Sequence, residues 1–227
     1  MTVQASAVPM RTTPLYKFWK NFVAAIMRIV FDQKSYGTRH VPREGGVLVV
    51  SNHVSYLDPC IIAAISPRQF AFLADSGLWT FKPFGWTISR LNAFPVTQGK
   101  GDVGAMKKTI ALLNDGWALT VFPEGMRSPT GRMMPVQAGA ALIIRRTNVP
   151  VVPAYIYGAY DAWPKHRLFP RRGHVKVIYR PAMDMSKLGA KEITAELTRV
   201  FAEMEKEAIE RFGPSGSSQN PPSAGQP

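Results

Sequence analysis

The chain has 227 residues and a formal net charge of +13, and 46% of its residues are hydrophobic. That length and apolar content are typical of one folded domain and exclude a wholly disordered chain. The positive charge favours an anionic partner such as nucleic acid, anionic lipid or a phosphorylated substrate, and a single cysteine excludes an internal disulfide.

The first predicted element is an amphipathic helix from Pro14 to about Phe31. Its apolar residues recur at spacings of three and four and therefore share one face, namely Leu15, Phe18, Trp19, Phe22, Val23, Ile26, Met27 and Val30. Lys20 and Asn21 lie inside this stretch, where polar groups disfavour a membrane span. We expect residues 1–34 to form an N-terminal segment lying at a membrane interface, with packing on the protein's own core as the alternative.

Strand and helix patterns then alternate along the chain. The predicted strands are 46–51, 69–73, 117–122, 149–156 and 174–179, and the predicted helices are 59–65, 102–114, 137–147 and 191–212. Such alternation predicts a single α/β domain over residues 35–212, with a largely parallel sheet flanked by helices. The prolines in 149–156 indicate an edge or irregular strand. Residues 213–227 carry no charge, aromatic or large aliphatic side chain and are expected to be a disordered tail.

The first polar motif is NHVSYLD at residues 52–58, directly after the predicted strand 46–51. In α/β sheets, sites form where strands end. A loop that folds back before the next helix can bring the Asp58 carboxylate to the His53 imidazole, fix its tautomer and make the other ring nitrogen a general base. The non-catalytic alternative is that Asp58 only caps the helix that starts at Pro59.

The second polar motif, FPEGMRS at residues 122–128, follows another predicted apolar strand. Gly125 permits a tight turn and a close approach of backbone to a ligand. Arg127 offers planar N–H donors suited to phosphate oxygens, and Ser128 adds a further donor. Glu124 can accept hydrogen bonds from a hydroxyl or orient the arginine. These residue types together favour a site for a phosphorylated polyol.

With both motifs in this order, the chain resembles the glycerolipid acyltransferase family, which includes bacterial 1-acyl-sn-glycerol-3-phosphate acyltransferases. NHVSYLD matches the family's NHxxxxD block, and FPEGMRS matches its FPEGTRS block with Met126 in place of threonine. VPVVPAYI at 149–156 matches the family's proline-bearing fourth block. The resemblance covers about residues 35–185.

This resemblance implies a role for each matching residue. His53 is expected to be the general base and Asp58 its partner. Glu124, Gly125 and Arg127 are expected to bind the acceptor, with Arg127 on its phosphate. No metal ligand is expected.

One family block departs from its usual pattern. The second block of the family ordinarily ends in an arginine that helps to hold the acceptor's phosphate. The corresponding stretch here, residues 92–100, has Gln98 at that place. Gln98 can donate hydrogen bonds but carries no charge, so Lys100 or Arg90 would have to supply it. If neither residue replaces the missing arginine, the expected acceptor is not a simple glycerol phosphate.

The implied reaction moves a fatty acyl group from acyl-CoA or acyl-ACP (acyl carrier protein) to the free hydroxyl of a lysophospholipid. The first acceptor to consider is 1-acyl-sn-glycerol-3-phosphate, in phospholipid biosynthesis. Beyond the acyl donor as co-substrate, no cofactor is expected. The expected location is the cytoplasmic face of an anionic membrane surface, peripheral or monotopic, with no nucleic acid as partner.

Three alternatives remain open at this point. The same chemistry can serve another acceptor, such as a lyso-ornithine lipid, a glycolipid or another lysolipid, and Gln98 keeps this reading open. The basic charge also permits a non-catalytic nucleic-acid-binding protein, although no helix-turn-helix, zinc or RNP pattern is present. The third alternative is a hydrolase: the sequence lacks the G-x-S-x-G turn of the common serine hydrolases, but a thioesterase-like side activity, with water in place of the acceptor, stays open.

Two further features carry expectations of their own. Cys60 lies in the apolar run CIIAAI and is expected to be a buried core thiol rather than a nucleophile. The segment 163–172 (WPKHRLFPRR) mixes basic and aromatic side chains and is expected either to lie on an anionic membrane or to be a solvated loop.

Overall fold

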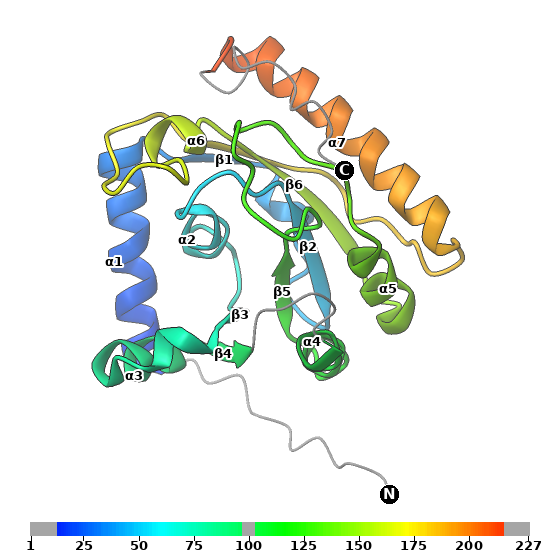
Figure 1. The fold of residues 1–227 in the computed structure, drawn as a ribbon, viewed down its shortest axis with the longest axis horizontal. Helices are drawn as coiled ribbons and strands as arrows, with labels where there is room; N and C mark the ends of the chain where they lie inside the picture. Colours follow the sequence, from blue (N-terminus) through cyan, green and yellow to red (C-terminus); the bar gives the residue numbers. More distant parts are fainter. Residues whose placement is uncertain (1–12, 97–102, 216–227) are drawn as a thin grey trace, which may run out of the picture.

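The computed structural model describes residues 13–96 and 103–215. Seven strands form one sheet in the order β1-β7-β6-β2-β5-β3-β4 (Figure 1). Only β6 and β7 pair antiparallel, and the other neighbours pair parallel. The strands are β1 (Lys34–Tyr36), β2 (Val47–Ser51), β3 (Phe70–Asp75), β4 (Ala93–Val96), β5 (Ala118–Val121), β6 (Val151–Tyr157) and β7 (Lys176–Tyr179).

Helices cover both faces of this sheet. They are α1 (Pro14–Phe31), α2 (Asp58–Ala64), α3 (Lys82–Arg90), α4 (Val103–Asn114), α5 (Ala138–Thr147), α6 (Ala159–Ala162) and α7 (Ala190–Phe212), with short 3-10 helices η1 (Thr38–His40) and η2 (Ser76–Trp79). Because side chains alternate along a strand, Val47 and Val49 of β2 pack with α1 and α2, whereas Leu48 and Val50 pack with α4, α5 and α7. Figure 1 shows these helices on opposite sides of β2.

The pairing of β2 with β5 brings the two polar motifs together. These strands lie side by side and parallel, with Val50 opposite Val121. Their carboxyl ends therefore reach the same edge of the sheet, and the segments 52–58 and 122–128 that follow them meet there. The predicted α/β class and the largely parallel sheet are confirmed.

The position of β6 differs from the prediction. Its prolines indicated an edge or irregular strand, and β6 lies inside the sheet between β2 and β7. Pro153 pairs with Val50 of β2, and on the β7 side it lies opposite Arg180, just beyond the end of β7. The N–H of Arg180 still donates to the Pro153 carbonyl at 2.9 Å, so only one bond is lost where the ladder already ends.

The N-terminal helix packs on the domain along one side only. Tyr16, Ala24, Met27 and Phe31 are buried, and α1 contacts α2. Within the described ranges, no helix is both long and apolar enough to cross a bilayer. The sequence thus predicted the helix correctly. The buried side of α1 packs on the protein's own core, as the alternative to a membrane-interface helix had it. Its attachment to a membrane stays a prediction.

At the other end of the chain, the ordered part extends beyond the predicted start of the tail. Gly213 accepts a hydrogen bond from the Tyr157 hydroxyl, and Ser215 is buried. These contacts hold residues 213–215 on the domain, and disorder of the tail stays a prediction. Residues 216–227 lie outside the described ranges.

The sequence did not predict β1, β4, α3 or α6, which are short or have a weak apolar pattern.

Candidate active site

His53 and Asp58 meet at the end of β2. The two side chains lie 2.7 Å apart, from His53 Nδ1 to Asp58 Oδ2. The Asp58 side chain is fully buried, whereas that of His53 is 18% exposed. An ionised carboxylate only accepts hydrogen bonds, so Nδ1 donates and Nε2 has the free lone pair of a base. A substrate can reach the imidazole but not the carboxylate that orients it.

The Asp58 carboxylate also organises the loop that carries His53. Its Oδ2 accepts hydrogen bonds from the backbone N–H groups of Val54 at 2.7 Å and Ser55 at 2.8 Å. Asp58 is the first residue of α2 rather than its N-cap, which is Leu57, so the predicted capping role was wrong. The carboxylate points back into the loop because it has three donors there. Burial raises the pKa of Asp58, and the bonds from His53, Ser55 and Val54 oppose that shift.

Glu124 holds the two motifs together through backbone groups. Its Oε1 accepts from the His53 N–H at 2.6 Å, and its Oε2 accepts from the Met134 N–H at 2.8 Å. The side chain is buried. Both oxygens are therefore bonded within the protein, and the contact of Glu124 with the acceptor stays a prediction. Burial raises the pKa of Glu124 to about 8, against the opposing effect of the two N–H donors.

Ser128 also faces inward. Its hydroxyl is buried and accepts from the Gly131 N–H at 3.0 Å, while its own N–H donates to the His53 carbonyl at 2.7 Å. Ser128 therefore stabilises the loop, and its contact with the acceptor stays a prediction. Gly125 lies in the exposed turn at φ 73°, a left-handed conformation that glycine adopts freely.

Arg127 is held by an aromatic ring that sequence reasoning missed. Its guanidinium carbon lies 3.5 Å from the centre of the Tyr56 ring. The Nη1 atom of Arg127 is buried and has no hydrogen-bond partner among the described residues. Tyr56 stands inside the first motif, so that motif supplies a contact to the second. The spacing of residues along the chain offered no signal for this contact.

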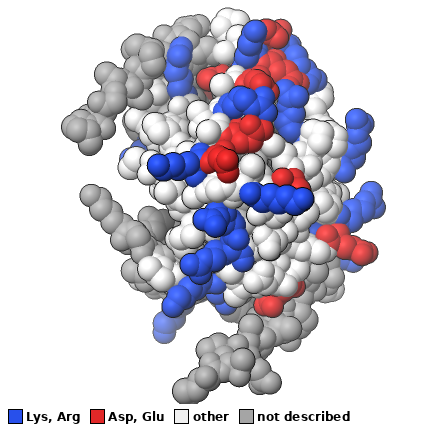
Figure 2. Space-filling view, turned by 90° about the vertical axis from the view of Figure 1, so that its right-hand side faces the viewer, with Lys and Arg blue, Asp and Glu red and all other residues white. Residues whose placement is uncertain are grey.

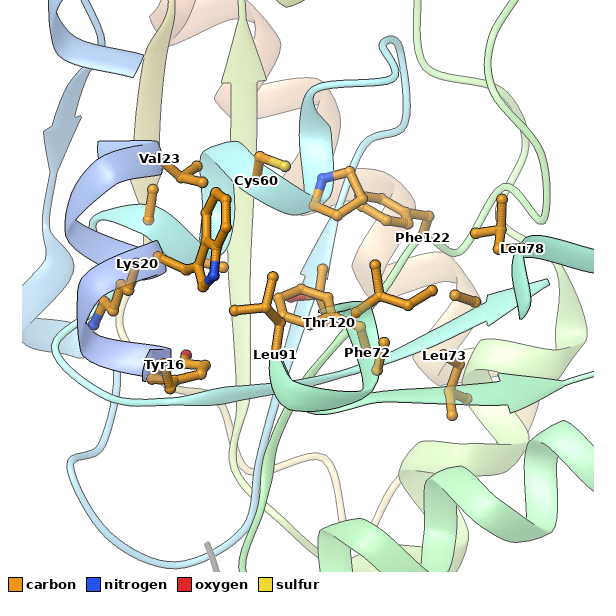
Figure 3. A pocket seen from close by; sticks show the side chains of 17 residues that line it. Tyr16, Lys20, Val23, Cys60, Phe72, Leu73, Leu78, Leu91, Thr120 and Phe122 are labelled. Carbon is orange, nitrogen blue, oxygen red and sulfur yellow. The ribbon is translucent and has the colours of Figure 1, made fainter. Parts of the chain in front are cut away.

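An apolar cavity of about 280 Å³ is lined in part by Phe122 (Figure 3). Phe122, at one side of this cavity, stacks on the His53 ring with the centroids 4.0 Å apart. The other walls come from elements far apart in the sequence, chiefly α1, α2, β3 and α3, including Tyr16, Trp19, Val23, Ala63, Leu78 and Leu91. Apolar pockets of this kind hold apolar ligand groups.

Cys60 lines this cavity and is exposed to it. The prediction of a core thiol was therefore wrong about its place, because α2 turns this residue toward the cavity instead of the sheet. The surrounding apolar groups and the Asp58 carboxylate raise the pKa of the Cys60 thiol. A protonated thiol is a weak nucleophile.

Two of the predicted acceptor residues, Gln98 and Lys100, lie outside the described ranges. Within those ranges, no three His, Cys, Asp or Glu side chains are grouped closely enough to hold a metal ion.

Asn52 has a role that the sequence did not predict. It anchors the start of the first motif, since its side chain exchanges hydrogen bonds with the backbone N–H and carbonyl of Ile156.

Comparisons with known proteins agree with this geometry. The acyltransferase family model matches residues 32–157. A 1-acyl-sn-glycerol-3-phosphate acyltransferase of Bacillus subtilis is 27% identical over 197 residues, which cover 85% of this chain and 96% of that protein. A chloroplastic 1-acyl-sn-glycerol-3-phosphate acyltransferase of Brassica napus is 32% identical, over 51% of this chain and 34% of that one.

A solved structure is similar over most of the fold. The 1-acyl-sn-glycerophosphate acyltransferase PlsC from Thermotoga maritima superposes with a TM-score of 0.76 at 26% identity, covering 87% of this chain and 82% of that chain. The chain thus has the α/β fold of these enzymes, with its two motif loops at the carboxyl edge of the sheet, and it is an O-acyltransferase. The chain belongs to the acyltransferase family.

Proposed function

We propose that this enzyme transfers a fatty acyl group from a thioester, acyl-CoA or acyl-ACP, to the free hydroxyl of 1-acyl-sn-glycerol-3-phosphate in phospholipid biosynthesis. The observation that carries the proposal is the contact of His53 with the buried Asp58 beside an apolar cavity. The similar bacterial and plant proteins are 1-acyl-sn-glycerol-3-phosphate acyltransferases, which supports this acceptor.

In the proposed reaction, His53 Nε2 takes the proton of the acceptor hydroxyl as its oxygen attacks the thioester carbonyl. Asp58 orients the imidazole and stabilises its cationic form. The carbon–sulfur bond then breaks, and the imidazolium returns the proton to the leaving thiolate. The products are the new ester and the free thiol of the carrier. General-base catalysis of this kind contributes about 10²–10⁴ in rate. The step requires no metal and no cofactor besides the acyl donor.

Each part of the substrates has a matching environment in this proposal. The acyl chain occupies the apolar cavity, whose near wall, Phe122, stacks on His53. The acceptor's phosphate binds the guanidinium of Arg127, a residue that is partly exposed. Phosphate oxygens are strong acceptors for guanidinium N–H donors.

Membrane attachment is the second part of the proposal. The helix α1 contains no acidic residue, and its outward side exposes Phe18, Phe22 and Ile29. Further exposed apolar side chains lie on neighbouring η2 and α3 and on the loop after α6, namely Leu78, Phe81, Trp86, Leu168 and Phe169. Basic residues accompany them, including Lys17, Arg28, Lys82, Lys165, Arg171 and Arg172. Apolar groups flanked by cations suit an anionic bilayer surface.

The face covered by α7 has a different character. Its exposed side chains are charged, and Arg199 pairs with both Glu196 and Glu203. Figure 2 shows acidic and basic side chains intermixed there. Such a surface favours contact with water.

Flotation with vesicles that contain anionic phospholipid tests whether α1, and not α7, binds the membrane. The double variant Phe18→Gln with Phe22→Gln should reduce binding, whereas Glu196→Gln should not. Unchanged flotation of the double variant would contradict a role for α1.

The reaction is tested by incubating the purified protein with a panel of lysolipids and either acyl-CoA or acyl-ACP, with mass spectrometry of the products. The expected result is thioester-dependent conversion of 1-acyl-sn-glycerol-3-phosphate and its loss in His53→Ala. Full activity of that variant would remove the mechanism. Conversion of a lyso-ornithine lipid or a glycolipid in preference to the phosphate acceptor would replace the acceptor but keep the chemistry.

A further inference from the structure

Three side chains from three separate segments contact one another in the order Arg127, Tyr56 and Trp163, and this row of contacts is called the stack below, although the two aromatic rings are tilted. Arg127 lies over the Tyr56 ring at 3.5 Å, measured from the guanidinium carbon to the ring centroid. The other neighbour of Tyr56 is Trp163, with ring centroids 5.2 Å apart and an interplanar angle of 41°. Tyr56 thus joins the arginine of the second motif to the segment that follows α6.

The far end of this stack is fixed by hydrogen bonds. The Trp163 indole N–H donates to the Arg167 carbonyl at 3.0 Å, and the Ser55 hydroxyl donates to the Trp163 carbonyl at 2.8 Å. Trp163 also packs against the buried core of the domain. It therefore gives Tyr56 a rigid support, and contact of the segment 163–172 with a membrane stays a prediction.

Stacking constrains an arginine without using its hydrogen-bonding edge. The face of the guanidinium rests on the ring, and its N–H groups stay in the plane, available to an anion. A long side chain that is free to rotate loses conformational freedom when it binds a ligand, and a side chain already held in place loses less. Pre-positioning of Arg127 therefore strengthens binding of the anionic acceptor without touching the reacting atoms.

Stability of the core is a poor explanation for the ring. The Tyr56 residue is 47% exposed, and its hydroxyl has no hydrogen-bond partner among the described residues. Arg127 contacts the aromatic face of Tyr56. Phenylalanine supplies the same face, whereas an aliphatic side chain does not.

We infer that Tyr56, supported by Trp163, is a positioning residue that holds Arg127 for the acceptor's phosphate and so contributes to the preference for a phosphorylated acceptor. This inference rests on the proposed function. A cation–π contact contributes about 0.5–2 kcal/mol, which converts to about a 2- to 30-fold change in an equilibrium constant.

The test compares the steady-state kinetics of Tyr56→Phe and Tyr56→Leu with 1-acyl-sn-glycerol-3-phosphate as acceptor. We expect Tyr56→Leu to raise KM for this acceptor by about 2- to 30-fold with kcat within about twofold of the wild type. Tyr56→Phe should keep both values. The activity on the phosphate-free acceptor 1-acylglycerol, where it is measurable, should be equal in all three proteins.

A matched control exists on another part of the molecule. Tyr36 also carries an arginine, with the Arg211 guanidinium carbon 4.7 Å from its ring centroid, and it stacks on Phe212. Tyr36→Leu removes a similar stack away from the two motifs and should leave KM unchanged. Should Tyr56→Leu fail to fold, Tyr56→Gln replaces it, because glutamine is long but has no aromatic ring.

The outcomes separate this inference from the proposed function. If Arg127→Gln raises KM for the phosphate acceptor but Tyr56→Leu does not, the inference is overturned and the proposed function stands. A fall in kcat at unchanged KM, or equal defects in Tyr56→Phe and Tyr56→Leu, also overturns it. If the wild type acylates neither acceptor, or Arg127→Gln has no effect on KM, the assignment of the phosphate to Arg127 fails and the inference fails with it.

Discussion

The two motif loops follow neighbouring parallel strands, yet they are held in different ways. In the first loop, residues 52–58, the Asp58 carboxylate accepts from three residues that precede it by three to five positions, so His53 and Asp58 are joined within the loop. In the second loop, residues 122–128, Glu124 bonds to His53 and Met134, and the Ser128 N–H donates to the His53 carbonyl. The pair of side chains in the first loop is thus made by local contacts, whereas Glu124 bonds to residues outside its own loop.

This difference teaches how far a short motif defines a site. A histidine and a carboxylate that meet within one loop can be inferred from their spacing. The bonds of a side chain to residues outside its own loop depend on partners that lie elsewhere in the sequence. The glutamate and serine of the second motif make such bonds within the protein, and their predicted contact with the acceptor stays a prediction.

The largest effect is expected from the centre of the first loop. Asp58→Asn keeps the side-chain volume and an oxygen for the two backbone donors, but it removes the negative charge beside the imidazole. We expect kcat to fall by about 10²–10⁴-fold with the fold retained. Circular dichroism and initial rates measure the two properties. A rate within threefold of the wild type would show that the loop does not depend on its carboxylate.

Titration of Glu124 should be visible in the stability of the second loop. Its pKa of about 8 in the folded protein exceeds the value of about 4.3 for an unfolded chain. A raised pKa means that the folded state binds the proton more tightly, so this group's contribution is complete below pH 4.3 and is lost as pH rises toward 8. The slope is at most about 1.4 kcal/mol per pH unit for one proton.

The measurement is the free energy of unfolding in urea between pH 5 and pH 8.5, for the wild type and Glu124→Gln. We expect the stability of the wild type relative to the variant to decrease as pH rises through this window. A constant difference between the two proteins would show that Glu124 does not titrate there, and an increase would mean that its pKa is lowered instead.

A smaller loss is expected at Ser128. Replacement by alanine leaves the buried Gly131 N–H without the acceptor that it has at 3.0 Å. An unsatisfied buried donor costs about 1–3 kcal/mol. Thermal unfolding of Ser128→Ala should show that loss, while KM for the acceptor should stay near the wild-type value. A KM increase without loss of stability would restore the predicted contact between Ser128 and the acceptor.

The smallest effect is expected at Gly125. An added Cβ would meet only the Gln137 side chain, at an ordinary contact distance of 3.7 Å, so there is space for alanine. The positive φ nevertheless disfavours any side chain by about 1–2 kcal/mol. Gly125→Ala should therefore lower the free energy of unfolding by about 1 kcal/mol. A loss of activity far beyond that loss of stability would indicate that a ligand approaches the backbone at this turn.

The sequence by itself determined the class of fold, most helices and strands, and the two motifs at strand ends. These features have local signatures, since the periods of 3.6 and 2 residues and the apolar strand cores lie within short windows. The neighbourhood of His53 and Asp58 was also within reach, because five residues separate them in one loop. The short β1 and β4 had no such signature.

Only the tertiary structure decided which side chains meet across the sheet. It turned Glu124 and Ser128 inward, placed β6 in the interior, put Cys60 into a cavity, and stacked Arg127 on Tyr56. These outcomes depend on contacts between residues up to about a hundred positions apart, such as Tyr56 with Trp163. Residue spacing contains no information about such contacts, because the packing of the whole domain fixes them.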